Sequence, residues 1–370
     1  MYRGRIEKDF NTWVSKGMLD AGAAKAMLAE YDARESVFST GRVLLILAAV
    51  LLSAAILLLV AANWEAIPRL VRVGGILGLI WAFYLLAAFC LGRGVKGLGA
   101  ALLVLATMTF GGAIALVGQM YHLSGDAADA LLVWFAASCV AAIVFRSAAL
   151  SVLCGFLAWA VFGQLVVDND ASLDGNGYIY LIPLLVVVVI ALVRYTNAGI
   201  ARHLGYLLAL AWLAWFYTEL PEVWVAAALF GAGLLAFLIA SLPVSPLYRF
   251  ARDAGAAPSF YSFALAILGL AALHAETSGF AQETVLGATT LAVALGGIAI
   301  AGRLNGAVRF LGYAVFAAET LYLAFETLGS MLGTSGFFLI SGLVVGLIAW
   351  LVIRVEKRLS AQTVAEGSVA

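Results

Sequence analysis

Long apolar segments dominate the chain from residue 43 onward, and short polar or glycine- and proline-containing segments separate them. Each apolar segment approaches the length of about 20 residues that an α-helix needs to cross a bilayer. The twelve segments are 43–62, 73–91, 98–118, 128–145, 147–167, 178–193, 203–218, 223–242, 259–275, 284–301, 307–325 and 332–353. The pattern predicts an all-α fold, a polytopic integral membrane bundle of about twelve transmembrane helices within residues 43–358.

The two ends of the chain depart from this pattern. Residues 1–42 carry apolar positions at helical spacing among polar ones, where Gly17 can end a first helix and Asp20 can begin a second. These residues predict a short cytoplasmic helical hairpin. The first apolar segment begins too late for a cleaved secretory signal, so we expect the N-terminus to be retained. The polar residues 359–370 predict a disordered cytoplasmic tail.

The positions of the basic residues indicate a topology. With a cytoplasmic N-terminus and twelve crossings, 19 of the 21 Lys and Arg residues fall on the same face as both termini. Only Arg69 and Arg72 fall on the opposite, outer face. Cytoplasmic loops are enriched in basic residues, so both termini are predicted to be cytoplasmic. Arg146 favours a turn between two segments, because an arginine at a helix centre costs about 2.5 to 3.5 kcal/mol on insertion.

Composition and motifs exclude several classes of protein. Hydrophobic residues make up 64% of the chain and charged residues only 11%, whereas soluble domains are about one quarter charged. The formal net charge is zero, which argues against a general nucleic-acid binder. No known enzyme signature is present, so we expect neither an enzyme nor a cofactor. The cysteines Cys90, Cys139 and Cys154 lie in apolar segments and predict neither a disulfide framework nor a metal site.

One acidic residue falls inside a predicted span. Glu319 follows Arg309 by ten residues, which places it about 15 Å deeper, near the middle of a bilayer core about 30 Å thick. No Lys or Arg lies at that depth in another span, while Tyr322 and Glu326 continue the same helical face. This stripe predicts a proton relay or an ion pathway, with a neutral glutamic acid that joins two helices as the structural alternative. We expect His274, at the outer end of its span, to be solvated.

A second group of polar residues lies at the outer ends of the first four spans. We interpret it as a network that locks the loop ends together, or as a polar site in which His122 carries protons and an arginine holds an anionic group. A metal site is not predicted, because His122 and Asp126 lack the context of a known metal motif. The residues of this outer polar cluster are Asn63, Glu65, Arg69, Arg72, Gln119, His122 and Asp126.

Three parts of the chain resemble a known family. They are the N-terminal helical pair with Leu28 and Tyr31, the segment 61–65 (Ala-Ala-Asn-Trp-Glu) followed by Pro68 and Arg72, and the segment 118–126 (Gly-Gln-Met-Tyr-His-Leu-Ser-Gly-Asp). Together they resemble the bacterial predicted membrane proteins called domain of unknown function 2157, over roughly residues 1–150. The resemblance implies a location in the bacterial inner membrane, and it implies no activity.

These observations favour transport or permeation of a small solute or ion, with Glu319 as a group that responds to protons or cations. The alternatives are a structural or assembly protein without transport, and an intramembrane enzyme that uses His122, Asp126 and Glu65. The expected partners are the lipid bilayer and a small solute or cation, and no nucleic acid. Small-residue helix faces, such as those of Gly74 and Gly78 or of Gly342 and Gly346, are candidates for a homo-oligomer contact.

Overall fold

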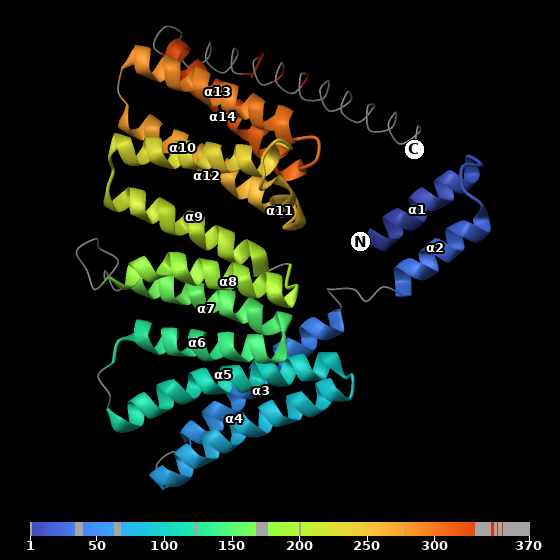
Figure 1. Cartoon of the computed structure of the whole chain (residues 1–370), viewed down its shortest axis with the longest axis vertical. Coiled ribbons are helices and arrows are strands. Elements are labelled where there is room, and N and C mark those ends of the chain that lie inside the picture. The colour runs from blue at the N-terminus through green and yellow to red at the C-terminus, as the bar shows by residue number, and fades with distance from the viewer. Residues whose placement is uncertain are drawn as a thin grey trace. The chain divides into compact units, whose positions relative to one another are not determined.

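The computed structural model is built from α-helices, and the residues that it describes contain no strand (Figure 1). It describes residues 2–33, 40–62, 68–122, 125–167, 177–199, 201–277 and 279–329, together with 342, 343, 346 and 350. The chain divides into two compact units, residues 1–124 and 125–370.

The first unit begins with two short helices, α1 (Tyr2–Ser15) and α2 (Ala21–Ala33), which contact each other. Gly17 has a φ of 68° and donates its N–H to the carbonyl of Val14, which ends α1. The Asp20 carboxylate accepts hydrogen bonds from the N–H groups of Gly22 and Ala23, at 2.8 and 3.2 Å, and so caps α2. The sequence-based predictions for Gly17 and Asp20 are thereby confirmed.

Three long apolar helices complete the first unit. They are α3 (Thr40–Ala62), α4 (Arg69–Gly92) and α5 (Lys96–Tyr121). Helix α5 packs against both others: its Ala101 lies against Ala49 of α3, and its Ala113 lies against Ile76 of α4. Thr107 of α5 also forms a hydrogen bond of 3.1 Å with Tyr84 of α4.

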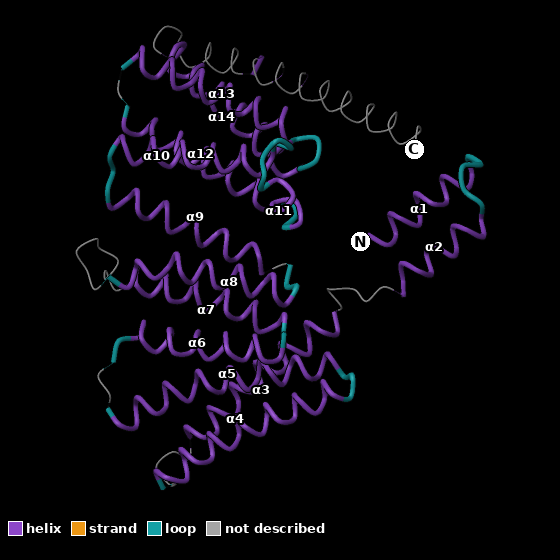
Figure 2. Tube along the Cα trace, viewed as in Figure 1, coloured by secondary structure: helices purple, strands orange, loops and turns teal. Residues whose placement is uncertain are grey.

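The second unit is a row of mostly antiparallel helices. They are α6 (Ala127–Phe145), α7 (Ala148–Val167), α8 (Ile182–Thr196), α9 (Ala201–Glu219), α10 (Val223–Ser241), the short α11 (Tyr248–Asp253), α12 (Ala257–Glu276), α13 (Phe280–Ala301) and α14 (Gly306–Gly329). A 3₁₀ turn at Tyr178–Leu181 precedes α8. Figure 2 shows the C-terminal ends of α6, α8, α10 and α13 at one end of this unit, and those of α7, α9 and α12 at the other.

Helices α10 and α12 approach each other most closely, and two glycines allow it. A Cβ atom on Gly233 would lie 2.4 Å from the backbone nitrogen of Ala266, and a Cβ atom on Gly269 would lie 2.2 Å from that of Phe230. Any side chain at either position would therefore separate the two backbones. By contrast, a Cβ atom on Gly74 or Gly78 of α4, which the sequence suggested as contact positions, would meet no atom within 4 Å.

The helices match the predicted apolar segments closely. Each of the first eleven segments corresponds to a described helix, and the twelfth, 332–353, lies mostly outside the described residues. The turn expected at Arg146 is confirmed, because α6 ends at Phe145 and Arg146 adopts a left-handed conformation with a φ of 45°. Within the described part of the chain, nine helices are long and apolar enough to cross a membrane, and α3 adds the shorter apolar stretch Val43–Ile56. The count of twelve stays a prediction, as does the disordered state of residues 359–370, which lie outside the described residues.

Candidate functional site

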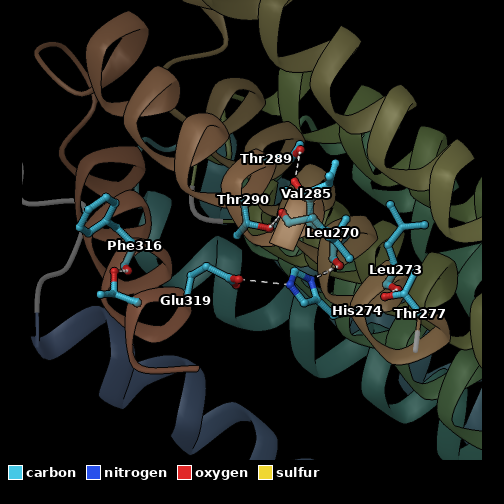
Figure 3. Close-up of polar contacts among 11 residues, drawn as sticks. Leu270, Leu273, His274, Thr277, Val285, Thr289, Thr290, Phe316 and Glu319 are labelled. Atoms are coloured by element: carbon cyan, nitrogen blue, oxygen red, sulfur yellow. Dashed lines mark hydrogen bonds and ion pairs between the residues drawn. The ribbon is translucent and has the colours of Figure 1, made fainter. Parts of the chain in front are cut away.

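A hydrogen-bonded pair of titratable side chains joins α12 and α14 in the second unit. The Nε2 atom of His274, on α12, lies 3.2 Å from the Oε1 atom of Glu319, on α14. Figure 3 shows the carboxyl group of Glu319 directed at the imidazole ring across the space between the two helices. Both side chains are largely enclosed, with exposed fractions of 17% for His274 and 9% for Glu319. We call this pair the His–Glu pair.

The backbone of α12 fixes the tautomer of His274. The Nδ1 atom lies 3.0 Å from the carbonyl oxygen of Leu270, one turn earlier on the same helix. A carbonyl oxygen can only accept a hydrogen bond, so Nδ1 carries a hydrogen. The Nε2 atom then either accepts a hydrogen bond from a protonated Glu319 or, in an imidazolium, donates one to an ionised Glu319. In both states a single proton lies between Nε2 and Oε1.

A third helix, α13, packs against the carboxyl group of the His–Glu pair. A Cβ atom on Gly287 would lie 2.9 Å from Oε1 of Glu319, so the absence of a side chain there makes room for the carboxyl group. Thr290, one turn further along α13, is buried and donates its hydroxyl hydrogen to the carbonyl of Leu286 at 3.0 Å. Gly287 and Thr290 carry no charge, and the acidic residue of α13 is Glu283, one turn before Gly287.

The pair borders a cavity of about 420 Å³ between α12, α13 and α14. His274, Thr290, Glu319 and Tyr322 are its polar lining residues, and its other walls are apolar. The Tyr322 ring meets the His274 ring edge to face, with the centroids 5.7 Å apart and an angle of 88° between the planes. The cavity therefore brings a few polar groups together inside an otherwise apolar wall.

The contact with His274 sets the level of Glu319 relative to α12. His274 lies two residues before the end of α12 at Glu276. Glu319 is therefore level with the last turn of α12, and its depth near the middle of a bilayer stays a prediction. Tyr322 lies beside it as expected, and Glu326 lies on α14, where its side chain is outside the described residues.

The expectation that His274 is solvated was wrong. His274 was expected to be solvated because it ends its span together with Glu276, yet α12 continues to Glu276 and His274 forms a hydrogen bond with Glu319 of α14. The neighbouring Glu276 is half-buried as well, and its Oε1 atom accepts a hydrogen bond of 2.8 Å from the Tyr217 hydroxyl of α9. The sequence signal that could have pointed to this pair was a histidine in the last turn of an apolar helix.

The described members of the outer polar cluster lie on different elements of the chain. Gln119 and His122 are exposed at the end of α5, where His122 has a φ of 49°, and Arg72 is half-buried on α4. Asp126 belongs to the second unit and caps α6 by accepting a hydrogen bond of 2.9 Å from the N–H of Ala128. Asn63, Glu65 and the side chain of Arg69 lie outside the described residues. The proposed contacts within this cluster therefore stay a prediction.

Among the described residues, no group of three or more His, Cys, Asp and Glu side chains could hold a metal ion. Cys139 on α6 and Cys154 on α7 are buried free thiols with their sulfur atoms 3.7 Å apart, and Cys90 is a half-buried free thiol on α4.

Comparison with known proteins identifies the N-terminal part of the chain. Residues 11–151 match the family described as "Predicted membrane protein (DUF2157)". The match confirms the resemblance found in the sequence and covers α2 to α6, the end of α1 and the start of α7. No curated protein and no solved structure gives a significant match. The DUF2157 match and the long apolar helices together make this a multi-pass membrane protein. The His–Glu pair lies beyond the matched DUF2157 region.

Proposed function

We propose that this protein passes a small solute or ion across the bacterial inner membrane in a manner controlled by protonation of the His–Glu pair. The observation that carries the proposal is the enclosed contact of 3.2 Å between Nε2 of His274 and Oε1 of Glu319 beside a cavity. Ionisable side chains within membrane segments are costly, and in transporters they commonly form proton relays. The proposal includes no enzymatic step and no cofactor.

The proposed topology has about twelve crossings with both termini in the cytoplasm. It is supported by the basic residues that gather at one end of the second unit. This end holds the connections after α6, α8, α10 and α13. The basic residues of these connections and of the adjoining helix ends are Arg146, Arg194, Arg202, Arg249, Arg252 and Arg303. Because basic residues are retained on the cytoplasmic side, we assign this end to the cytoplasm. The His–Glu pair then lies toward the outer side, as does the outer polar cluster, which would serve as a vestibule.

Loss of the shared proton would break the link between α12 and α14. With Nδ1–H fixed by the carbonyl of Leu270, a deprotonated Nε2 atom presents a lone pair to the Glu319 carboxylate. Two acceptors at 3.2 Å repel each other, so the α12–α14 contact loosens when the proton leaves. Proton binding thus favours the closed arrangement of the two helices, and proton release favours an open one.

The test is flux in proteoliposomes that contain the wild type or the variant Glu319→Gln. The probe is proton movement, followed with entrapped pyranine under a potassium diffusion potential, with and without Na⁺. A glutamine at position 319 can donate an N–H to Nε2 of His274, which keeps the helix contact but cannot titrate. We expect folded protein whose flux is reduced about tenfold or more.

The matched control is Glu222→Gln. Glu222 is an exposed carboxylate immediately before α10, without a side-chain capping bond, so its neutralisation should leave flux unchanged. Wild-type flux in Glu319→Gln, or an equal loss in Glu222→Gln, would contradict the proposed role of the His–Glu pair.

A structural role is the second candidate, and the enclosure of Glu319 favours it. The carboxyl group is buried, touches the position of Gly287 and joins two helices, as a purely structural hydrogen bond would. In that case Glu319→Ala would lower thermal stability, while Glu319→Gln, which retains the bond, would keep both stability and any measured flux. Reduced flux in the stable Gln variant separates the two functions.

A further inference from the structure

A second cavity lies at the opposite end of the second unit from the His–Glu pair. It has a volume of about 430 Å³ and lies between the α8–α9 connection and the segment around α11. Arg194 at the end of α8, Asn197 after it and Arg202 at the start of α9 line one side. We call this cavity the arginine pocket.

Both arginines are held in position by the opposite wall. Arg202 donates a hydrogen bond from Nη1 to the carbonyl of Ala254. Gly255 makes this approach feasible, because it has a φ of 82° and a Cβ atom there would lie 2.7 Å from Nη1. The Arg194 guanidinium stacks over the Phe250 ring of α11, 4.0 Å from its centroid. Two positive charges are thus fixed on one pocket before any ligand arrives.

The two arginines of the pocket give it a net positive charge among the described lining residues. Among the described residues, neither arginine forms an ion pair, although the exposed Asp253 also lines the cavity. Tyr206 also lines the cavity with a phenol group, and Asn197 adds an amide. Guanidinium, phenol and amide groups are all hydrogen-bond donors, and together they suit a phosphate group with its several acceptor oxygens.

The other residues in and around the arginine pocket are typical of a protein surface that contacts lipid. The pocket continues along apolar side chains that include Ile190 and Ile239. Beside it, Val244, Leu247 and Phe250 expose 94%, 54% and 59% of their area next to basic residues of α11. Exposed apolar and basic side chains on one short segment are typical of the boundary between lipid tails and headgroups.

We propose that the arginine pocket binds the phosphate group of an anionic phospholipid from the surrounding leaflet. The phosphate would lie between the guanidinium groups of Arg194 and Arg202, and the start of an acyl chain would follow the apolar wall. Basic pockets between membrane helices bind anionic headgroups in the same manner. A soluble phosphate compound shares the headgroup chemistry, so the experiment includes it as a separate arm.

The first test measures lipid binding to the full-length protein in detergent by native mass spectrometry. The lipids are phosphatidylglycerol and phosphatidylcholine, and inorganic phosphate is the soluble probe. We expect a preference for phosphatidylglycerol that falls about tenfold or more in Arg194→Gln/Arg202→Gln, since both basic groups near the anionic lipid contribute to its binding. The control Arg249→Gln removes an exposed charge of α11 that does not line the pocket, and it should retain the preference.

An unchanged preference in the double variant, or an equal loss in Arg249→Gln, would overturn the proposal. Stabilisation by inorganic phosphate that depends on the two arginines, without any preference for phosphatidylglycerol, would overturn the lipid source.

The second test uses the wild type, so it does not depend on the folding of a variant. Phosphatidylglycerol with a photoreactive group next to its headgroup is crosslinked to the protein in vesicles, and the modified peptides are identified. Adducts are expected within residues 190–206 or 247–258. Adducts confined to other parts of the chain would contradict the assignment.

Discussion

At the scale of single residues, a backbone carbonyl determines what the His–Glu pair can do. Leu270 accepts the hydrogen of Nδ1, which leaves Nε2 of His274 as the one ring atom whose protonation can change. The sequence predicted Glu319 and Tyr322 because a carboxylate in an apolar span is conspicuous. It missed His274 because a histidine at the outer end of its span was expected to be solvated. Only the packing of α12 against α14 brings the last turn of one helix level with the middle of the other.

Gly287 offers a test of the carboxyl position at this scale. In Gly287→Ala, the new Cβ atom would lie 2.9 Å from both Oε1 of Glu319 and Cδ2 of Leu323. We expect the carboxyl group to be displaced from His274 and the protein to lose about 1 to 3 kcal/mol of stability. The measurements are thermal unfolding in detergent and the infrared carbonyl band of Glu319 as a function of pH.

The matched control is Gly296→Ala on the same helix. A Cβ atom there meets no atom within 4 Å, and alanine favours helices over glycine, so we expect equal or higher stability. A normal pH dependence of the carbonyl band in Gly287→Ala would show that the pair tolerates the added methyl group and would contradict the prediction.

At the scale of helices, the sequence patterns predicted where helices lie along the chain better than they predicted which helices contact one another. Apolar length predicted the spans, and local chemistry at Gly17, Asp20 and Arg146 predicted where helices begin or end. Contacts between helices were harder to predict, because a glycine spacing does not reveal which face meets another helix. The close contact is made by Gly233 and Gly269 rather than by a glycine pair four residues apart.

The close contact between α10 and α12 gives a prediction at this scale. Gly269→Ala would place a methyl group 2.2 Å from the backbone nitrogen of Phe230, and a backbone cannot move aside as a flexible side chain can. We expect a loss of more than about 3 kcal/mol, or no folded protein. Gly231→Ala, on α10 in open space, is the control and should unfold at the wild-type temperature or above. Equal unfolding temperatures for the two variants would mean that α10 and α12 do not pack this closely.

At the scale of the whole molecule, the distribution of charge predicts a topology, and the helices of the second unit are consistent with it. Connections rich in arginine share one end of the second unit, as the alternation of predicted spans requires. The sequence did not reveal that the chain divides into two compact units, because that division depends on contacts between helices. It also did not reveal the arginine pocket, since Arg194, Arg202 and Phe250 come together only through the packing of α8, α9 and α11.

The topology predicts the sides reached by two connections. Asp170 lies between α7 and α8, and Arg252 lies on α11, so an odd number of predicted crossings separates them. Reporter fusions after Asp170 should be active as alkaline phosphatase, whereas fusions after Arg252 should be active as a fluorescent protein that matures in the cytoplasm. Finding both positions on one side would refute the topology and, with it, the assignment of the arginine pocket end to the cytoplasm.

Helices α12 and α14 are also tied at the end far from the His–Glu pair, by the buried side chain of Asn305. Its amide donates to the carbonyl of Ala256 at 2.8 Å, while its oxygen accepts from the N–H groups of Ala307 and Val308 at 3.2 and 3.4 Å. This contact contains no titratable group, so a change in protonation of the His–Glu pair does not alter it. If proton release loosens the His–Glu pair as proposed, α12 and α14 would separate at that end and stay joined at Asn305, which makes the motion a rotation of one helix against the other rather than a translation along it.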